Sequence, residues 1–147
     1  MLLREKLFKG QLFAYDRRVT IAEHLQQRFK PNLFLGNLVP TVGRVYILGG
    51  GVLSAIDNVK IGDDGSTRLA ADTDLNNPLY ECFPTDYRVV GTRRITELLV
   101  GTSEANFTHR EIGIFAGTTL ISTLKILPEF EKTIVKVRTY IHEMGWF

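Results

Sequence analysis

The chain has 147 residues, of which 44% are apolar and 23% charged, and its formal net charge is +2 at pH 7. This length and composition are typical of one globular domain with a single core. No stretch approaches the ~18 apolar residues of a membrane span, and the start lacks the small-residue cleavage site of a signal peptide. A single cysteine, Cys82, excludes an intramolecular disulfide and fits synthesis in a reducing cytoplasm.

The first part of the chain, residues 1–43, is predicted to be an N-terminal arm followed by one α-helix. The apolar residues of the arm have no partner within it, so we expect them to pack on the domain or on another chain. The candidate interface residues of the arm are Leu3, Leu7, Phe8, Leu12 and Phe13.

The helix is predicted over Asp16–Lys30, because apolar residues recur there at spacings of three and four. Thr20 and Glu23 have the spacing of a capping box, Asp16 is a competing start, and Pro31 ends the helix.

The rest of the chain, residues 44–147, is predicted to be an antiparallel β domain, either a sandwich or a barrel-like fold. Short β-rich runs alternate with turn signals, and no βαβ alternation or internal repeat is present. The predicted strands are Arg44–Leu48, Tyr87–Gly91, Arg93–Val100, Glu111–Phe115, Leu120–Leu127 and Thr133–Ile141.

The charge is uneven along the chain: residues 1–44 carry a net +5, residues 45–81 a net −4 and residues 82–147 a net +1. A basic head followed by an acidic segment suits a neighbouring subunit of the opposite polarity. The head has no dense run of Lys and Arg and no interleaved stacking aromatics, so nucleic acid is not expected as a partner. No membrane partner is expected either.

No group of residues predicts a catalytic, cofactor or metal site. The histidines, His24, His109 and His142, lie far apart, and Gly49–Gly51 lacks the G-K-[ST] continuation of a phosphate loop. The Asp-rich segment 57–74 has adjacent carboxylates and no distal bidentate Glu, so a solvated loop is expected there. Whether this segment binds an ion stays open.

Glu111 stands in the apolar stretch R-E-I-G-I-F, without a nucleophile or an oxyanion-hole signature nearby. The pleat of a strand places Ile112 and Ile114 toward a core and Glu111 on the other face, where it is expected to pair across strands. Gly113 marks either a bulge or a close approach of another backbone, and Gly117 a turn. The fold landmarks of this segment are Glu111, Gly113, Phe115 and Gly117.

Several short motifs occur in a fixed order: Y-I-L-G-G-G from Tyr46, E-A-N from Glu104, E-I-G-I-F from Glu111, and E-K-T from Glu131. In this order they resemble small structural proteins of tailed bacteriophages, found among tail-fibre, baseplate and neck or collar components. The resemblance covers about residues 44–141. Gly51 departs from the usual polar residue after the early strand, and the C-terminal T-Y-I-H-E-M-G-W-F departs from a regular strand.

The resemblance implies a non-enzymatic virion protein, assembled in the host cytoplasm, that acts as a connector or adaptor beside other virion structural proteins. A symmetric homo-oligomer is expected, and the C-terminal Trp146 and Phe147 are added to the candidate interface. Deleting residues 1–14 or 145–147 is expected to block incorporation into the particle and leave the β domain folded. The alternative is a carbohydrate- or receptor-binding β-module of a tail fibre, with Tyr80, Phe83 and Tyr87 as the aromatic cluster to test.

Overall fold

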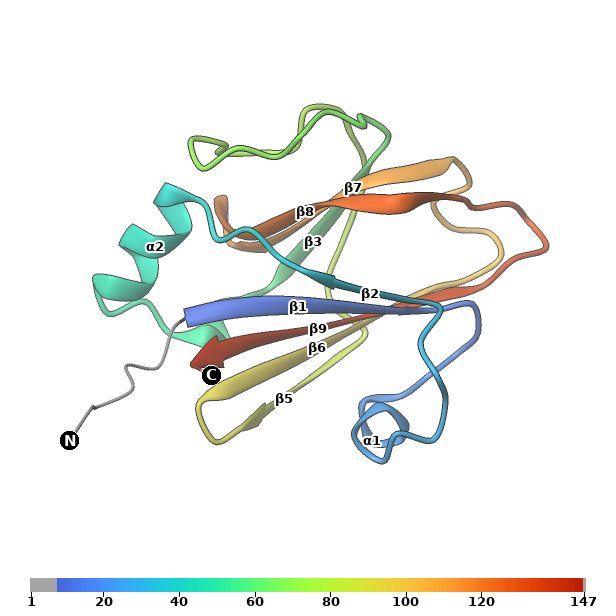
Figure 1. Ribbon diagram of the computed structural model, residues 1–147, viewed down its shortest axis with the longest axis horizontal. Helices are drawn as coiled ribbons and strands as arrows, with labels where there is room; N and C mark the ends of the chain where they lie inside the picture. Colours follow the sequence, from blue (N-terminus) through green and yellow to red (C-terminus); the bar gives the residue numbers. More distant parts are fainter. Residues whose placement is uncertain (1–7, 147) are drawn as a thin grey trace.

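The computed structural model describes residues 8–146, which form a sandwich of two antiparallel β-sheets (Figure 1). Five strands form one sheet in the order β2-β1-β9-β6-β5, and four strands form the other in the order β4-β3-β7-β8. The prediction of a mainly β, antiparallel fold is therefore confirmed, as a sandwich and not as a closed barrel.

The five-stranded sheet corrects the prediction of an N-terminal arm. The first described strand, β1, lies inside this sheet between β2 and the C-terminal strand β9, and Leu12 is only 1% exposed. A deletion of residues 1–14 would remove most of β1, so it cannot leave the β domain intact. The strands of this sheet are β2 Leu33–Gly36, β1 Phe8–Tyr15, β9 Arg138–Trp146, β6 Arg93–Val100 and β5 Asp86–Val90.

The predicted boundary at residue 43 therefore does not separate two bodies in space. The chain enters the five-stranded sheet with β1 and β2 and returns to the same sheet at its end, where β1 and β9 pair along eight residues from Phe8↔Trp146 to Tyr15↔Thr139.

The four-stranded sheet contains the segment with the fold landmarks. β7 and β8 form its hairpin, and Gly117 has a φ of +59° at the turn, as the sequence predicts. Ile112 and Ile114 of β7 point into the core between the sheets, which confirms their predicted placement. The strands are β4 Pro78–Cys82, β3 Asn58–Gly62, β7 Thr108–Ala116 and β8 Thr119–Glu131.

The core between the sheets is continuous, and a second, smaller cluster lies on the outer face of the five-stranded sheet. That second cluster is covered by α1, Ile21–Leu25, which is much shorter than the predicted helix. Its capping box of Thr20 and Glu23 is present as predicted. The buried members of the second cluster are Tyr15, Val19, Ile21, Ile95 and Ile141.

The segment predicted as the strand Arg44–Leu48 is part of a helix, α2, which spans Thr41–Leu48. Pro40 occupies its N-cap and Gly49 its C-cap, and the helix packs on β8. At Gly43 an added Cβ would lie 2.6 Å from the backbone carbonyl oxygen of Ile121, so close packing on the sheet selects the helix over the β preference of V-Y-I-L. A short 3₁₀ helix, η1, follows at Leu53–Ala55.

The last predicted strand, Thr133–Ile141, is displaced toward the C-terminus. Residues 133–137 form a turn and loop, and β9 begins at Arg138 and continues to Trp146. The sequence T-Y-I-H-E-M-G-W, which did not resemble a regular strand, is thus a regular central strand with polar residues on it.

Candidate functional site

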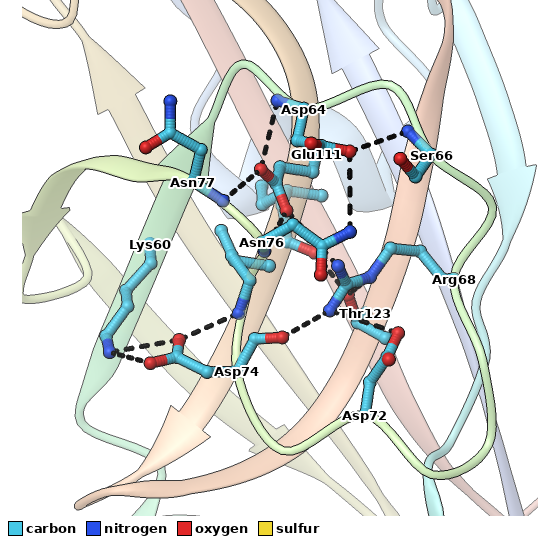
Figure 2. A network of polar contacts seen from close by, with 12 residues as sticks. Lys60, Asp64, Ser66, Arg68, Asp72, Asp74, Asn76, Asn77, Glu111 and Thr123 are labelled. Carbon is cyan, nitrogen blue, oxygen red and sulfur yellow. Dashed lines mark hydrogen bonds and ion pairs between the residues drawn. The ribbon is translucent and has the colours of Figure 1, made fainter.

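Glu111 lies on the outer face of the four-stranded sheet, where the loop of residues 63–77 covers it completely (Figure 2). Its carboxylate lies 3.2 Å from Nη1 of Arg68. It also accepts hydrogen bonds from the backbone N–H groups of Asp64, Asn76 and Asn77, at 3.0, 2.7 and 2.9 Å. The predicted cross-strand partner is therefore wrong, because Glu111 binds the loop and not the neighbouring strands.

Arg68 completes this arrangement from the loop. Its Nε donates to the hydroxyl of Thr123 on β8 at 2.9 Å, and its Nη2 donates to the carbonyl oxygen of Asp74 at 2.6 Å and lies 3.3 Å from Asp72 (Figure 2). Since both charged side chains are buried and fully engaged with each other and with the loop, they hold the loop on the sheet. A buried carboxylate with these partners is a structural element of the fold.

The Asp-rich segment is ordered by contacts within the loop and with Lys60 of β3. Asp63 accepts a hydrogen bond from the side chain of Asn77, Asp64 from the backbone of Ser66, and Asp74 lies 3.2 Å from Nζ of Lys60. Hydrogen bonds from Ser66 and Asn76 hold the pKa of Asp64 below its usual value. Within residues 8–146 no three His, Cys, Asp or Glu side chains converge in a way that would hold a metal ion.

Gly113 lies opposite Lys60 and Thr123 in regular register, while the irregularities of β7 lie on either side of it. A Cβ at this position would lie 2.9 to 3.1 Å from the side chains of Phe115, Leu120 and Leu75. Of the two interpretations of this glycine, a bulge is wrong, and the close neighbours are side chains instead of another backbone.

The motifs E-A-N and E-K-T, about 25 residues apart in the sequence, lie together in the structure. Nζ of Lys132 donates to the side-chain oxygen of Asn106 at 2.7 Å, and the backbone N–H of Lys132 donates to Phe107 at 3.1 Å. Glu104 accepts a hydrogen bond of 2.7 Å from the hydroxyl of Tyr80. These residues join the loop before β7 to the end of β8 and to β4, which is a role in the fold.

The histidines occupy three separate buried places. Burial lowers the pKa of His109 to about 4 and that of His142 to about 3. Neutral His109 donates from Nε2 to the carbonyl oxygen of Ala105 and accepts at Nδ1 from the hydroxyl of Tyr140, at 2.9 and 2.7 Å. His24 is hydrogen-bonded to the Tyr15 hydroxyl at 2.8 Å.

One end of the sandwich exposes apolar side chains to solvent. The start of β1, the end of β9 and α2 lie at this end (Figure 1). Their side chains line a cleft of about 430 Å³. Phe8 and Trp146 stack edge to face with their ring centroids 5.3 Å apart, and Leu48 is 79% exposed. We call this surface the α2 corner; its residues are Phe8, Lys9, Arg44, Ile47, Leu48 and Trp146.

The candidate interface residues divide between this corner and the interior. Phe8 and Trp146 lie at the α2 corner, whereas Leu12 is in the core and Phe13 packs beside the second cluster. Leu3, Leu7 and Phe147 fall outside the described residues. Ile47 and Leu48 were missed, because a strand was expected where α2 forms; Pro40 and Gly49 were the available signals of a helix.

A second cleft, of about 530 Å³, lies beside α1 on the outer face of the five-stranded sheet. The rings of Phe13 and Phe29 line it, together with His24, whose Nε2 lies 3.6 Å from the carboxylate of Glu143. Lys30 and Arg93 also line this cleft. Aromatic and charged side chains in one concave site can bind a small polar molecule.

The three aromatic residues proposed from the sequence as one cluster, Tyr80, Phe83 and Tyr87, lie in three different environments. Tyr80 is half-buried and bonded to Glu104, Phe83 is exposed between the two sheets' edge strands, and the ring of Tyr87 lies 4.1 Å from the guanidinium carbon of Arg94. Tyr87 and Phe83 remain on the surface, at and just before β5.

Comparison of the chain with models of protein families, with curated proteins and with solved structures finds no match. Among the described residues, neither helix has the length or the apolar content required to cross a membrane.

Proposed function

We propose that this chain is a non-enzymatic structural component of a tailed-phage virion, a connector or adaptor in the tail, baseplate, fibre or neck-collar region. The observation that carries the proposal is the α2 corner, where Phe8, Ile47, Leu48 and Trp146 offer apolar surface at one end of a rigid sandwich. Exposed apolar clusters with aromatic anchors are typical of protein–protein interfaces. In this function the corner packs against a neighbouring virion protein.

The motifs that resemble phage structural proteins support the same function, because their charged side chains hold loops of the sandwich in place. Glu111 fixes a surface loop, and Lys132 fixes the loop before β7 through Asn106. Both buried charged groups are engaged in ion pairs and hydrogen bonds that hold surface loops on the sandwich. The polar side chains of these motifs therefore stabilise the fold, whereas the α2 corner is exposed and can contact another protein.

The experiment that tests the proposal is quantitative mass spectrometry of phage particles purified on a density gradient from cells that produce this chain. The expected result is that peptides of the chain sediment with the particles at a constant copy number per particle, calibrated on the capsid protein. Peptides that remain at the top of the gradient, with none in the particle fraction, would overturn the proposed function.

The second candidate function is a carbohydrate-binding module, and the cleft beside α1 is the observation that favours it. Phe13 and Phe29 contribute apolar ring atoms to the lining of this cleft, and Glu143 and His24 offer polar groups beside them. Nuclear magnetic resonance titration of the chain with mono- and disaccharides tests it. Shifts confined to this cleft and reduced by Glu143→Gln would support sugar binding; unchanged spectra would exclude it for those sugars.

A further inference from the structure

The strand β5, Asp86–Val90, forms an exposed edge of the five-stranded sheet. Within the described residues it pairs with β6 alone, and each of its five residues is exposed. Tyr87, Val89 and Val90 are 51%, 51% and 47% exposed. An exposed edge with aromatic and β-branched residues favours addition of another strand.

The other three edge strands have features that oppose such addition. Leu38, two residues after the end of β2, forms an isolated antiparallel bridge with Thr123 of β8, and α2 packs on β8. β4 begins with Pro78 and has a register irregularity against β3. β5 contains neither Pro nor Lys, and its register with β6 runs without a shift from Asp86↔Glu97 to Val90↔Arg93.

The register shows which backbone groups of β5 face outward. The tight turn at Gly91–Thr92, with a φ of +60° at Gly91, makes Val90 and Arg93 a hydrogen-bonded pair. Because such pairs alternate, Tyr87 and Val89 direct their N–H and C=O groups away from β6. In agreement, the N–H of Tyr87 donates to the side-chain carboxylate of Asp86 at 2.8 Å and not to a strand.

The charges on β5 are complementary to those of a second copy of β5. If two β5 strands pair antiparallel with Tyr87 opposite Tyr87, Asp86 of each copy lies opposite Arg88 of the other. The outward N–H and C=O groups of Tyr87 then bond reciprocally across the two-fold axis. A shift by one step would instead place Arg88 opposite Arg88, and like charges directly opposite destabilise a strand pair.

The isolated chain leaves these two charges poorly matched. Asp86 lies directly opposite Glu97, a buried acid whose pKa is raised by its burial and by the charge of Asp86. Arg88 lies opposite the apolar Ile95 and makes no hydrogen bond or ion pair within residues 8–146. An Arg88 side chain from a second copy, placed beside Asp86, would relieve the repulsion between the two acids.

We propose that β5 is the seam along which two copies of this chain join, with Tyr87 opposite Tyr87 and two reciprocal Asp86–Arg88 pairs. The five-stranded sheet then continues from one copy into the other. The seam deepens the proposed function and rests on its premise of a repeated structural subunit. The strand β5 does not contribute to the α2 corner, so the corner remains available for a different neighbour.

The test uses sedimentation velocity of the full chain at low salt, with the variants Asp86→Arg, Arg88→Asp and the double swap. The wild-type chain is expected to dimerise, and each single variant, which turns both pairs repulsive, to weaken dimerisation by about tenfold. The double swap restores the pairs and is expected to return the affinity to within about threefold of wild type. A mixture of the two single variants is expected to form heterodimers.

Asp86 and Arg88 are both exposed, so the circular dichroism spectrum should show the same fold in every variant. A wild-type chain that is monomeric at all concentrations, single variants that dimerise normally, or a double swap that fails to recover would each overturn the seam. The proposed function is tested separately by the particle fraction. A dimer that is absent from particles contradicts the function alone, and a monomer found in particles contradicts the seam alone.

Discussion

The loop on the four-stranded sheet and the α2 corner differ in which side chains are exposed to solvent. Beneath the loop, two charged side chains are withdrawn from solvent: Arg68 of the loop is buried, and Glu111 of β7 is 0% exposed, with hydrogen-bond partners for both oxygens of its carboxylate. At the corner, apolar residues remain in solvent, with Leu48 as the extreme case. Each arrangement is costly by itself, but the cost of the first is offset within the chain.

This difference separates residues that serve the fold from residues that serve a partner. The Glu111 group is complete without any other molecule, because its charges and the loop N–H groups satisfy one another. The α2 corner is not complete in this sense, since its apolar surface gains stability only when another surface covers it. Substitutions in the two regions should therefore affect different measurements.

The largest effect on stability is expected for Glu111→Gln. The substitution removes the charge that balances Arg68, whose side chain is buried, and places an amide N–H₂ toward backbone donors. The free energy of unfolding should fall by about 3–5 kcal/mol, measured by urea denaturation. Its matched control is Glu129→Gln, which breaks the exposed pair with Arg110 and should cost less than about 1 kcal/mol. Equal decreases in the free energy of unfolding of the two variants would contradict the role of Glu111 in holding the loop on the sheet.

The next effect is the pH dependence of stability that comes from the buried histidines. The folded-state pKa of His142 is about 3 and that of His109 about 4, both below the ordinary value of about 6.5. The unfolded chain therefore binds protons that the folded chain excludes, and stability falls as the pH drops from about 6.5 toward these values. Each histidine should cost about 2 kcal/mol between pH 7 and 5.

The variant His142→Gln isolates one of these contributions. It removes a titrating group and retains a side chain able to bond Ser122, which lies 3.1 Å from Nε2 of His142. The slope of unfolding free energy against pH should therefore decrease, whatever the stability of the variant at pH 7. An unchanged slope would show that His142 titrates alike in both states.

The parts of the fold that could be predicted from the sequence are those that depend on local patterns of residues. The β6 strand, the β7–β8 hairpin with Gly117 and the capping box at Thr20 were predicted correctly, because alternation, turn glycines and caps act locally. The helix α2 was missed because V-Y-I-L has a β preference that contact with β8 overrides. Local patterns cannot report that contact.

The candidate site was likewise predictable only where local sequence patterns decide the position of a residue. Trp146 was proposed for an interface because an aromatic side chain at the end of the sequence is costly to expose, and Phe8 because the apolar N-terminal segment has no partner within itself; both lie at the α2 corner. Leu12 has the same local pattern, yet it lies in the core since β1 is a central strand. The partner of Glu111 was also beyond prediction, because Arg68 lies 43 residues away in an irregular loop.

A smaller effect is expected for Gly113→Ala, which sharpens the account of how the loop covers β7. The new Cβ meets the side-chain ends of Phe115, Leu120 and Leu75, which can shift, so the loss should be about 1–3 kcal/mol. Gly36→Ala is the control: it has open space within 4 Å and should change stability by less than about 0.5 kcal/mol. If both variants were equally stable, the loop would not be packed as described.

The smallest effect on stability, and the largest on assembly, is expected for Leu48→Ser. Because the side chain is 79% exposed, the free energy of unfolding should change by less than about 0.5 kcal/mol. Val135→Ser is the matched control, since Val135 is 83% exposed in the loop between β8 and β9, away from the α2 corner.

The most direct measurement of the central claim is the copy number of these two variants in purified phage particles, determined by quantitative mass spectrometry. If the α2 corner is the docking surface of a virion component, the Leu48→Ser chain should be depleted about tenfold, as expected for the loss of about 1.4 kcal/mol at an interface. The Val135→Ser chain should be present at the wild-type copy number. Equal incorporation of both variants would contradict the account.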